Sequence, residues 1–379
     1  MKKGWERKQL GELAELRGRI GWRGLTAKEY TKSGPFFLSV HSLNYGDYVD
    51  WRDAFHISEE RYTESPEIML QKDDVLICKD GAGIGKLGIV GELPDRTTIN
   101  SSLLLIRSGK HILPKFLYHC LTSPYFQDIV QSRLNGATTP HLYQRDITEF
   151  PVVVPPLAEQ QRIVGVLDEA FAGLATAQAH AEKNRQNARA LFESHLQSVF
   201  THRGKAWVEK PFEDCIEDVT YTTKIQRKEF LEDGKYPIVS QEAEFTNGYW
   251  NKAADVFKVT RPVVIFGDHT QVLKYVDFDF VLGADGVKLL PPKPFLIPKF
   301  FFYHLRSAPL KSLGYARHYR LLKELQISYP DLNAQAKIVA KLDALANETQ
   351  RLESLYQQKL AALAALKKSL LHQAFTGEL

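Results

Sequence analysis

A segment of 45 residues occurs twice in this chain, and this duplication constrains the fold more than any other feature. The copies run over 157–201 and 332–376, with a constant offset of 175 positions and no insertion in either. Matching pairs across the offset include Leu157 and Leu332, Gln160 and Gln335, Ile163 and Ile338, Leu167 and Leu342, Asp168 and Asp343, Leu191 and Leu366, and Leu196 and Leu371. We therefore expect one structural element to be present twice.

The spacing of apolar residues predicts that each copy is one long helix. In the second copy these residues recur at alternating steps of four and three, which is the 3.5-residue rhythm of a coiled-coil seam. Neither copy contains proline, Asp331 is suited to cap the second helix, and Gly204 and Gly377 follow the predicted ends. The predicted seam comprises Ile338, Leu342, Leu345, Thr349, Leu352, Tyr356, Lys359, Leu363, Leu366 and Leu370, and in the first copy Ile163, Leu167, Ala170, Leu174, Ala177, Ala181, Asn184, Ala188, Leu191 and His195.

The two predicted helices are suited to pack against each other. The middle of the first copy is small where the second copy has Leu352 and Tyr356, and small residues opposite large ones fill a shared interface. At ~1.5 Å per residue, each helix would span roughly 65 Å, whereas most globular helices have about 11 or 12 residues. We favour an antiparallel coiled coil. The alternative is that each is a long amphipathic helix on its own domain.

The segments between the repeats predict two mixed domains. In the first, β-prone runs at 36–40, 74–78, 87–90 and 102–106 precede a helix-like stretch that opens at Pro114. In the second, the run 263–268 and a stretch opening at Pro298 repeat this plan. We therefore predict an α+β fold with pseudo-two-fold symmetry, in which two mixed α/β domains at 1–155 and 204–330 alternate with spacer helices at 156–203 and 331–379.

Composition restricts the class of protein. The longest apolar runs are far shorter than the ~18 residues of a membrane-spanning helix, and the basic start Met1-Lys2-Lys3 is not followed by an apolar signal core. The three cysteines are unclustered, as in reduced cytoplasmic proteins, and suggest neither a disulfide framework nor a metal site. The net charge of +4 is too small to indicate nucleic acid by itself.

The glycine-rich stretch 81–88 is the one candidate for a nucleotide site. Gly83, Gly85 and Gly88 satisfy the spacing G-x-G-x-x-G, but a β-prone run and then Pro94 follow where a dinucleotide site needs a helix. We favour a tight glycine hairpin or a close backbone approach, for example to a DNA phosphate. No H-E-x-x-H, G-x-S-x-G or Asn/Asp-Pro-Pro-Tyr/Phe motif appears, so the sequence indicates recognition or scaffolding, with no catalytic residue of its own.

Polar and aromatic side chains on the predicted loops are the candidates for DNA contact. The loop 135–141 and the stretch 317–320 are favoured, because each stands just before the long helix of its half. Singly, each residue is also what an ordinary solvated surface would carry. The candidates in the first domain are Arg17, Arg19, Trp22, Arg23, Lys79, Arg133, Thr138, Thr139 and His141. Those in the second are Lys224, Gln241, His269, Gln271, Arg317, His318, Tyr319 and Arg320.

The whole chain resembles the specificity subunits of Type I restriction-modification systems. The resemblance rests on the alternating order of domains and helices, on Pro-Pro-Leu-Ala-Glu-Gln-Gln-Arg-Ile-Val at 155–164, and on Gln-Ala-Phe-Thr-Gly-Glu-Leu at 373–379. The second copy departs from it, because Leu-Asn-Ala-Gln-Ala-Lys-Ile-Val stands where Ala-Glu-Gln-Gln-Arg would repeat.

The resemblance implies a function that fits the reading of the residues. Each domain would be a target recognition domain that reads one half of a bipartite sequence in double-stranded DNA, and the helices would fix the unread spacer. Two adenine methyltransferase subunits would dock on the helices and supply the S-adenosylmethionine chemistry; a restriction/translocase subunit could join them. The chain itself would be non-catalytic, cytoplasmic and free of cofactor and metal. The alternatives are a coiled-coil scaffold that binds only protein, and an enzyme that uses the glycine turn.

Overall fold

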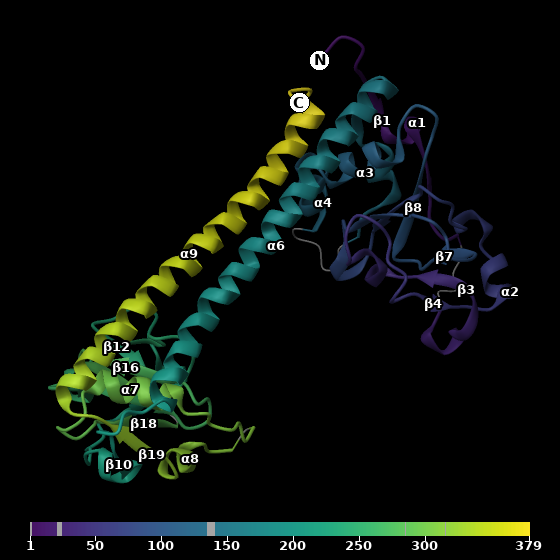
Figure 1. The fold of residues 1–379 in the computed structure, drawn as a ribbon. Helices are drawn as coiled ribbons and strands as arrows, with labels where there is room; N and C mark the ends of the chain where they lie inside the picture. The colour runs from purple at the N-terminus through teal and green to yellow at the C-terminus, as the bar shows by residue number, and fades with distance from the viewer. Residues whose placement is uncertain (1, 21–24, 135–140, 285, 315) are drawn as a thin grey trace. The chain divides into compact units, whose positions relative to one another are not determined.

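The chain folds into two compact units. The computed structural model describes residues 2–20, 25–134, 141–284, 286–314 and 316–379. The first unit comprises residues 1–181 and 359–379, and the second comprises residues 182–358. Each unit contains one globular part and a portion of both long helices, as Figure 1 shows. The alternating order of globules and helices is confirmed, whereas the domain boundaries at 155, 203 and 330 stay a prediction.

The two long helices have the predicted bounds. Helix α6 covers Leu157–Thr201 and helix α9 covers Leu332–Thr376. Asp331 caps α9, since its Oδ1 accepts a hydrogen bond of 2.9 Å from the backbone N–H of Ala334. Gly377 follows with φ of +82°, the left-handed conformation that commonly ends a helix.

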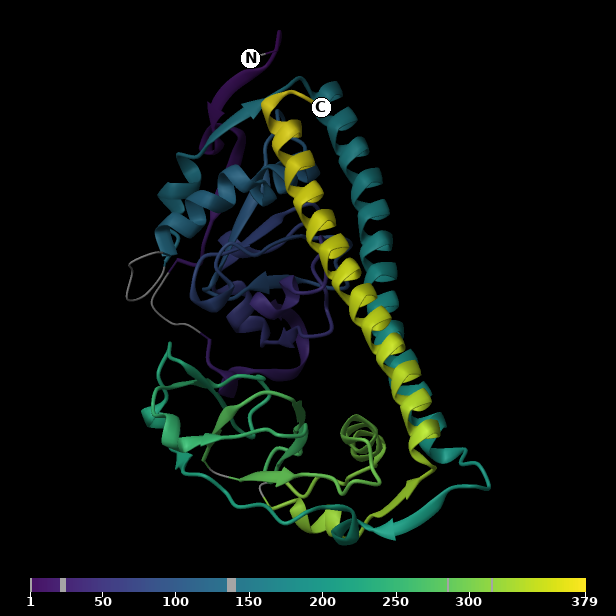
Figure 2. The same cartoon turned by 90° about the vertical axis from the view of Figure 1, so that its left-hand side faces the viewer.

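Within each unit the helices lie side by side and antiparallel (Figures 1 and 2). In the first unit, Arg162 near the start of α6 donates to the backbone oxygen of Leu379 at 2.9 Å. Further along α6, the Phe171 ring lies 4.8 Å from the ammonium of Lys367. In the second unit, Arg189 Nε lies 2.7 Å from Glu353 Oε2. The residue numbers rise along one helix as they fall along the other, so the antiparallel pairing is confirmed.

The predicted seam is buried or half-buried over most of its length, but Asn184 and Lys359 in the middle are exposed, and the buried face changes near the end of each helix. Leu191 and its repeat partner Leu366 are 55 % and 47 % exposed, although both were assigned to the seam. His195 is exposed too, and the neighbouring Leu196 is buried in its place. The cause is that the last turns pack on the globular part of their unit, where contact follows the 3.6-residue period of a straight helix and not the 3.5-residue period of a seam. The residues buried there are Phe192, Leu196 and Phe200 in α6 and Leu371 and Ala374 in α9.

In its described residues, the first globular part contains three small sheets. The largest has the antiparallel order β2 (Ala14–Arg17), β8 (Leu103–Ser108), β5 (Val75–Cys78), β6 (Leu87–Ile89). In the second, β3 (Thr31–Leu38) lies between β4 (Phe55–His56) and β7 (Thr97–Ile99). The third pairs β1 (Glu6–Gln9) with β9 (Pro151–Val154). The helices here are α1 (Leu10–Leu13), α2 (Glu59–Thr63), α3 (Pro114–Thr122), α4 (Pro124–Leu134) and α5 (Gln144–Thr148).

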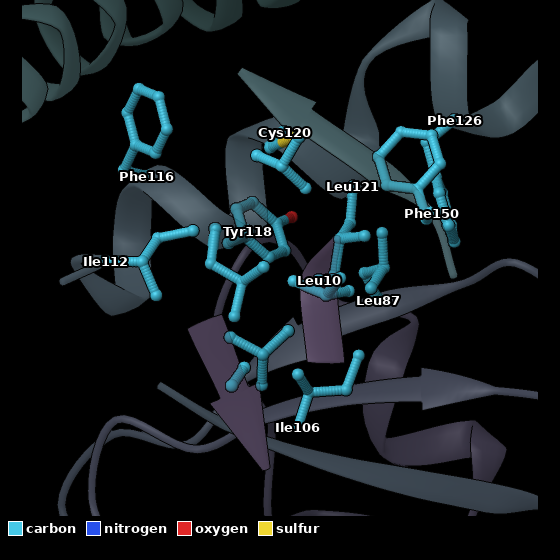
Figure 3. Packing of buried hydrophobic residues seen from close by; sticks show 14 of the residues in the cluster. Leu10, Leu87, Ile106, Ile112, Phe116, Tyr118, Cys120, Leu121, Phe126 and Phe150 are labelled. Atoms are coloured by element: carbon cyan, nitrogen blue, oxygen red, sulfur yellow. The ribbon is translucent and has the colours of Figure 1, made fainter. Parts of the chain in front are cut away.

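Strand β5 is covered on both faces. Val75 and Ile77 pack into one core with α3, α6 and the end of α9, while Leu76 and Cys78 pack into a second core on the opposite face. Figure 3 shows the first of these cores, in which the rings of Phe126 and Phe150 meet edge to face with centroids 4.8 Å apart. Because both faces of β5 are covered, only the ends of this strand and the loops beside it remain for contact with a partner.

The second globular part repeats this plan with different strands. A three-stranded sheet has the order β16 (Leu273–Val276), β15 (Val263–Gly267), β18 (Val287–Leu290). Val264 and Phe266 face a core with α7 (Pro298–Ser307) and the long helices, and Val263 and Ile265 face another. Strand β10 (Val208–Pro211) pairs with β19 (Gln326–Tyr329), and α8 (Tyr319–Lys323) precedes β19. The remaining sheet joins β11 (Lys224–Ile225), β17 (Phe280–Gly283), β12 (Tyr236–Val239), β13 (Gly248–Trp250) and β14 (Val256–Phe257).

Candidate nucleic-acid interface

In both units an aspartate at the end of the central strand holds a distant loop. Asp80 follows β5, and its Oδ1 is hydrogen-bonded to Nδ1 of His141. Asp268 follows β15, and its backbone oxygen accepts a 2.7 Å hydrogen bond from the backbone N–H of His318. Its Oδ1 accepts from the N–H of Tyr319 at 2.7 Å. His141 in the first unit, and His318 and Tyr319 in the second, thus lie at equivalent strand ends.

Three predicted residues of the first unit lie around this strand end. Lys79 Nζ is 3.5 Å from Asp80 Oδ2, so Asp80 interacts with both Lys79 and His141. Arg17 follows Leu16, whose backbone oxygen accepts a hydrogen bond of 3.0 Å from the Gln144 side chain. Arg17 is paired with Glu15. Because Asp80 and Glu15 offset the nearby positive charges, this surface is suited to directional hydrogen bonds more than to bulk attraction of phosphate.

The other predicted residues of the first unit either lie away from the strand end or fall outside the described residues. The side chain of Arg19 is almost buried, and its Nη2 lies 3.4 Å from Glu64 Oε2. Trp22, Arg23, Thr138 and Thr139 lie outside the described residues, as does the side chain of Arg133. Two residues that the sequence reading missed flank the loop. Tyr143 is exposed, with its ring centroid 4.6 Å from that of His141, and Arg145 lies 5.3 Å from the Tyr143 ring.

The glycine-rich stretch is a hairpin turn, as the sequence predicted. It joins β5 to β6 through a short 3₁₀ turn at Gly81–Gly83, and no helix follows it. Gly81 and Gly85 have φ of +80° and +83°, a conformation that glycine adopts without strain. A Cβ at Gly85 would lie 2.9 Å from Val130 Cγ1, so the turn also packs closely on α4. This geometry lacks the helix N-terminus that a dinucleotide site needs.

In the second unit, predicted polar residues converge at the end of β15. The side-chain oxygen of Gln241 accepts a 3.2 Å hydrogen bond from the N–H of His269. Gln271 adopts φ of +59°, and its side-chain amide donates to the Lys311 backbone oxygen at 3.4 Å. Gly286 makes this convergence possible, because a Cβ there would lie 2.5 Å from the Gln241 oxygen and 2.9 Å from His269 Cδ2.

His318 is not a surface residue, although the sequence reading placed it among the DNA contacts. Its side chain is 1 % exposed. Nδ1 lies 3.0 Å from the backbone oxygen of Asp268, and Nε2 accepts a hydrogen bond of 2.9 Å from the backbone N–H of Leu313. Both ring nitrogens are therefore engaged in holding the loop. A buried and fully bonded imidazole has no atom left for a base, so we remove His318 from the candidate interface.

A group of aromatic and basic residues flanks the same strand end. The Tyr319 ring lies 5.1 Å from Lys288 Nζ and 5.7 Å from Lys323 Nζ, and burial raises the pKa of this tyrosine. Lys224 Nζ lies 4.6 Å from the Tyr221 ring. Arg317 and Arg320 are exposed beside this group. The sequence reading missed Tyr221 and Lys288; for Lys288, its place as the one partly exposed residue of β18 is visible only once the strand is known.

The two surfaces offer amide, imidazole, hydroxyl and cationic groups on loops held by a rigid strand. These are the groups that read base edges and bind phosphates. Among the residues that the structure describes, no cluster of histidine, cysteine and acidic side chains is arranged to hold a metal ion. Within the same ranges, no helix is both long enough and apolar enough to cross a membrane. Cys78, Cys120 and Cys215 are buried and free.

Comparison with known proteins gives one consistent family. Residues 2–183 and 205–361 match the model of the Type I restriction modification DNA specificity domain. The specificity subunit of the Type I restriction enzyme EcoBI from Escherichia coli is 28 % identical over 168 residues, 44 % of this chain and 34 % of that subunit. The MjaVIII specificity subunit from Methanocaldococcus jannaschii is 20 % identical over 351 residues, which cover 83 % of this chain and 80 % of that protein.

Two solved structures have the same fold. One, from a study of complex assembly and conformational transition of the type I R-M system, has a TM-score of 0.83 at 19 % identity and covers 100 % of this chain and 99 % of that one. The HsdS subunit from Thermoanaerobacter tengcongensis has a TM-score of 0.61 at 19 % identity, with coverage of 100 % and 98 %.

Proposed function

Because the chain belongs to the Type I restriction-modification DNA specificity family, we propose that each of its units reads one half of a bipartite DNA sequence. The observation that carries this proposal is that the two units have equivalent strand ends, at β5 and at β15, with different groups beside them. Asp80 and Asp268 hold equivalent loops, yet the groups presented beside them differ. Lys79 and His141 stand in one unit, and Gln241, His269 and Tyr319 in the other. One frame with two sets of donors and acceptors is suited to two different half-sites.

The paired helices then act as the spacer between the two readings. Each helix is continuous from one unit into the other, and each unit contains a portion of both helices. An uninterrupted helix of 45 residues is a stiff element of fixed length, at ~1.5 Å per residue. A separation of about one turn of DNA, ~34 Å, lies within what such helices can set. The length of the gap between half-sites would therefore be set by the helices.

We propose that the same methyltransferase subunit docks twice, once on each unit. Of the twelve positions that match across the offset, seven are buried or half-buried in both copies and are explained by packing. The other five matches are exposed in both copies, and three of them lie together on one face of each helix: Ala190, Leu191 and Ser194 in α6, and Ala365, Leu366 and Ser369 in α9. Between 169 and 189 no residue matches its counterpart in 344–364. Retention of a solvent-exposed leucine in both copies is what a partner shared by both would require.

Charge placed on these leucines is expected to remove the methyltransferase subunits one at a time. Leu366→Asp should lower the affinity of the methyltransferase subunit for the first unit by about 30-fold or more, because it buries a charge at the centre of an apolar contact. Leu191→Asp should do the same on the second unit. Native mass spectrometry of the complex would count the subunits. Leu355→Asp is the matched control, since Leu355 is 48 % exposed but its counterpart is His180. Two bound subunits on the double variant would contradict the proposed docking site.

The chain's own role in this proposal is binding, and the reaction belongs to its partners. The methyltransferase subunits would bring S-adenosylmethionine and flip the target adenine out of the duplex. A restriction/translocase subunit could join the same complex. A protein-only scaffold would need neither strand-end surface, and an enzyme built on the glycine turn would need a helix where β6 stands.

The experiment that tests the function is methylome sequencing with variants confined to one unit. Gln241→Ala is expected to relax recognition in one half of the motif, and Tyr143→Ala in the other half, each by about 10- to 100-fold for the affected base, the usual weight of one base contact. The gap and the untouched half should not change. Each variant is the control for the other. If either variant altered both halves, or if the chain supported no bipartite motif, the proposal would fail.

A further inference from the structure

A fully buried glutamine at the start of each long helix joins that helix to the globular part of its unit. In the first unit, Gln160 Oε1 accepts a 2.8 Å hydrogen bond from the N–H of Leu113, directly before α3. Its Nε2 donates to the backbone oxygens of His111 and Pro155, both at 2.9 Å. One side chain thus connects α6, the segment that leads into α6, and the loop that leads into α3.

The second unit has the same arrangement with different neighbours. Gln335 Oε1 accepts from the N–H of Ile297 at 2.8 Å, and its Nε2 donates to the oxygens of Phe295 at 2.9 Å and Pro330 at 2.8 Å. The loop residues that contact it are not those of the first unit. The glutamine and its hydrogen bonds are the same, although an apolar side chain could fill the site without the need for three partners.

An aspartate two turns further along each long helix provides a second attachment. Asp168 Oδ1 lies 3.2 Å from Lys115 Nζ and 3.1 Å from His119 Nε2, both on α3. Asp343 Oδ1 lies 3.2 Å from Lys299 Nζ and accepts a hydrogen bond of 2.6 Å from the hydroxyl of Tyr303, both on α7. The carboxylate is present in both units, while its second partner is His119 in the first unit and Tyr303 in the second.

Two attachments between a long helix and its globular part prevent a rotation that a single attachment would allow. A single contact between two helices leaves a pivot about which the globular part can swing. Gln160 fixes the start of α3 on α6, and Asp168 fixes the same helix one turn later, so rotation about either point is opposed by the other. Directional hydrogen bonds define an angle in a way that apolar contact, which is non-directional, does not.

We propose that Gln160 with Asp168, and Gln335 with Asp343, are positioning residues that fix the angle of each reading surface on its spacer helix and so make the gap between half-sites exact to one base pair. This inference rests on the proposed function. A neighbouring gap displaces the half-site by about 3.4 Å and rotates it by roughly 35°. Only a reading surface that cannot swing would reject that displaced site.

The test is the tolerance of the assembled complex for incorrect gaps. Gln160→Leu and Gln335→Leu remove the hydrogen bonds at nearly constant size, and Gln161→Leu is the exposed control one residue along. Methylation rates are measured on duplexes whose gap is correct, one base pair shorter or one longer. The glutamine variants are expected to lose about tenfold of their preference for the correct gap, with unchanged half-sites, and the control none.

Three results would be distinguishable. If the unaltered protein showed no preference for one gap, the proposed function itself would fail. If it showed a preference that Gln160→Leu and Gln335→Leu kept, even with a lower melting temperature, the glutamines would be structural only and the inference would be overturned. Should a leucine variant not fold, Asp343→Asn replaces it, since the amide oxygen still accepts from Tyr303 while the ion pair with Lys299 is lost. An unchanged preference in that variant would also count against the inference.

Discussion

Lengthening both long helices by seven residues is expected to widen the unread gap by about three base pairs. Seven helical residues add ~10.5 Å at ~1.5 Å each, and a base pair occupies about 3.4 Å along the duplex. The insertions would stand between Ala181 and Glu182 in α6 and between Gln358 and Lys359 in α9, where the two units divide. Seven residues are close to two turns, so the facing surfaces return to within ~20° of their original direction.

Methylome sequencing of cells that carry the lengthened chain would give both half-sites and the gap in one measurement. Both half-sites should be unchanged, because no residue of either strand-end surface is altered. The control is the same insertion in α6 alone, which leaves the partner helix too short and should abolish methylation. A motif with new half-sites and the original gap would show that the helices do not set the distance.

Asp74→Ala is expected to destabilise the first unit by about 2–3 kcal/mol, because hydrogen bonds to a charged group contribute ~1.5–3 kcal/mol and the Arg107 side chain left behind is 22 % exposed. Asp74 is 1 % exposed, and its carboxylate accepts hydrogen bonds of 2.8 Å from both Nε and Nη2 of Arg107. It also accepts one of 2.6 Å from the N–H of Gln71. The carboxylate raises the pKa of Arg107, and its removal leaves the guanidinium and the N–H of Gln71 without this partner.

Denaturant unfolding followed by tryptophan fluorescence would measure this loss. Glu92→Ala is the matched control, because Glu92 pairs with Lys72 near the same strand but both side chains are largely exposed. Exposed pairs contribute ~0–1 kcal/mol, so the control should unfold almost as the unaltered protein does. Equal effects of the two variants would show that burial of Asp74 is not what gives the pair its weight.

The long helices could be predicted from the sequence because their signals are local. The 3.5-residue rhythm, the cap at Asp331 and the stop at Gly377 all lie within or beside the segment that they define. The change of buried face at Leu191 and Leu366 could not be predicted in this way. It depends on contacts with α3 and α7, which are distant in sequence, and a continued heptad was the simpler extrapolation.

The candidate surfaces were predictable in part for the same reason. Lys79, Gln241 and His269 were chosen as polar residues on loops, and they do lie at strand ends. The partnership of Asp80 with His141, 61 residues apart, comes from tertiary structure. His318 shows this limit, because a histidine in the basic stretch 317–320 looks like a surface residue until its ring nitrogens are seen to bond Leu313 and Asp268.

The central stretch of the two long helices, from 169 to 189 and from 344 to 364, has no residue in common between the copies. The groups that we propose to contact DNA, to position each globular part and to bind the methyltransferase all lie outside it. The sequence of each half-site and the length of the gap can therefore change independently: a changed loop alters one half-site, and an added heptad lengthens the gap. The number of possible target sites is then the product of the number of loop variants and the number of helix lengths, without any new fold.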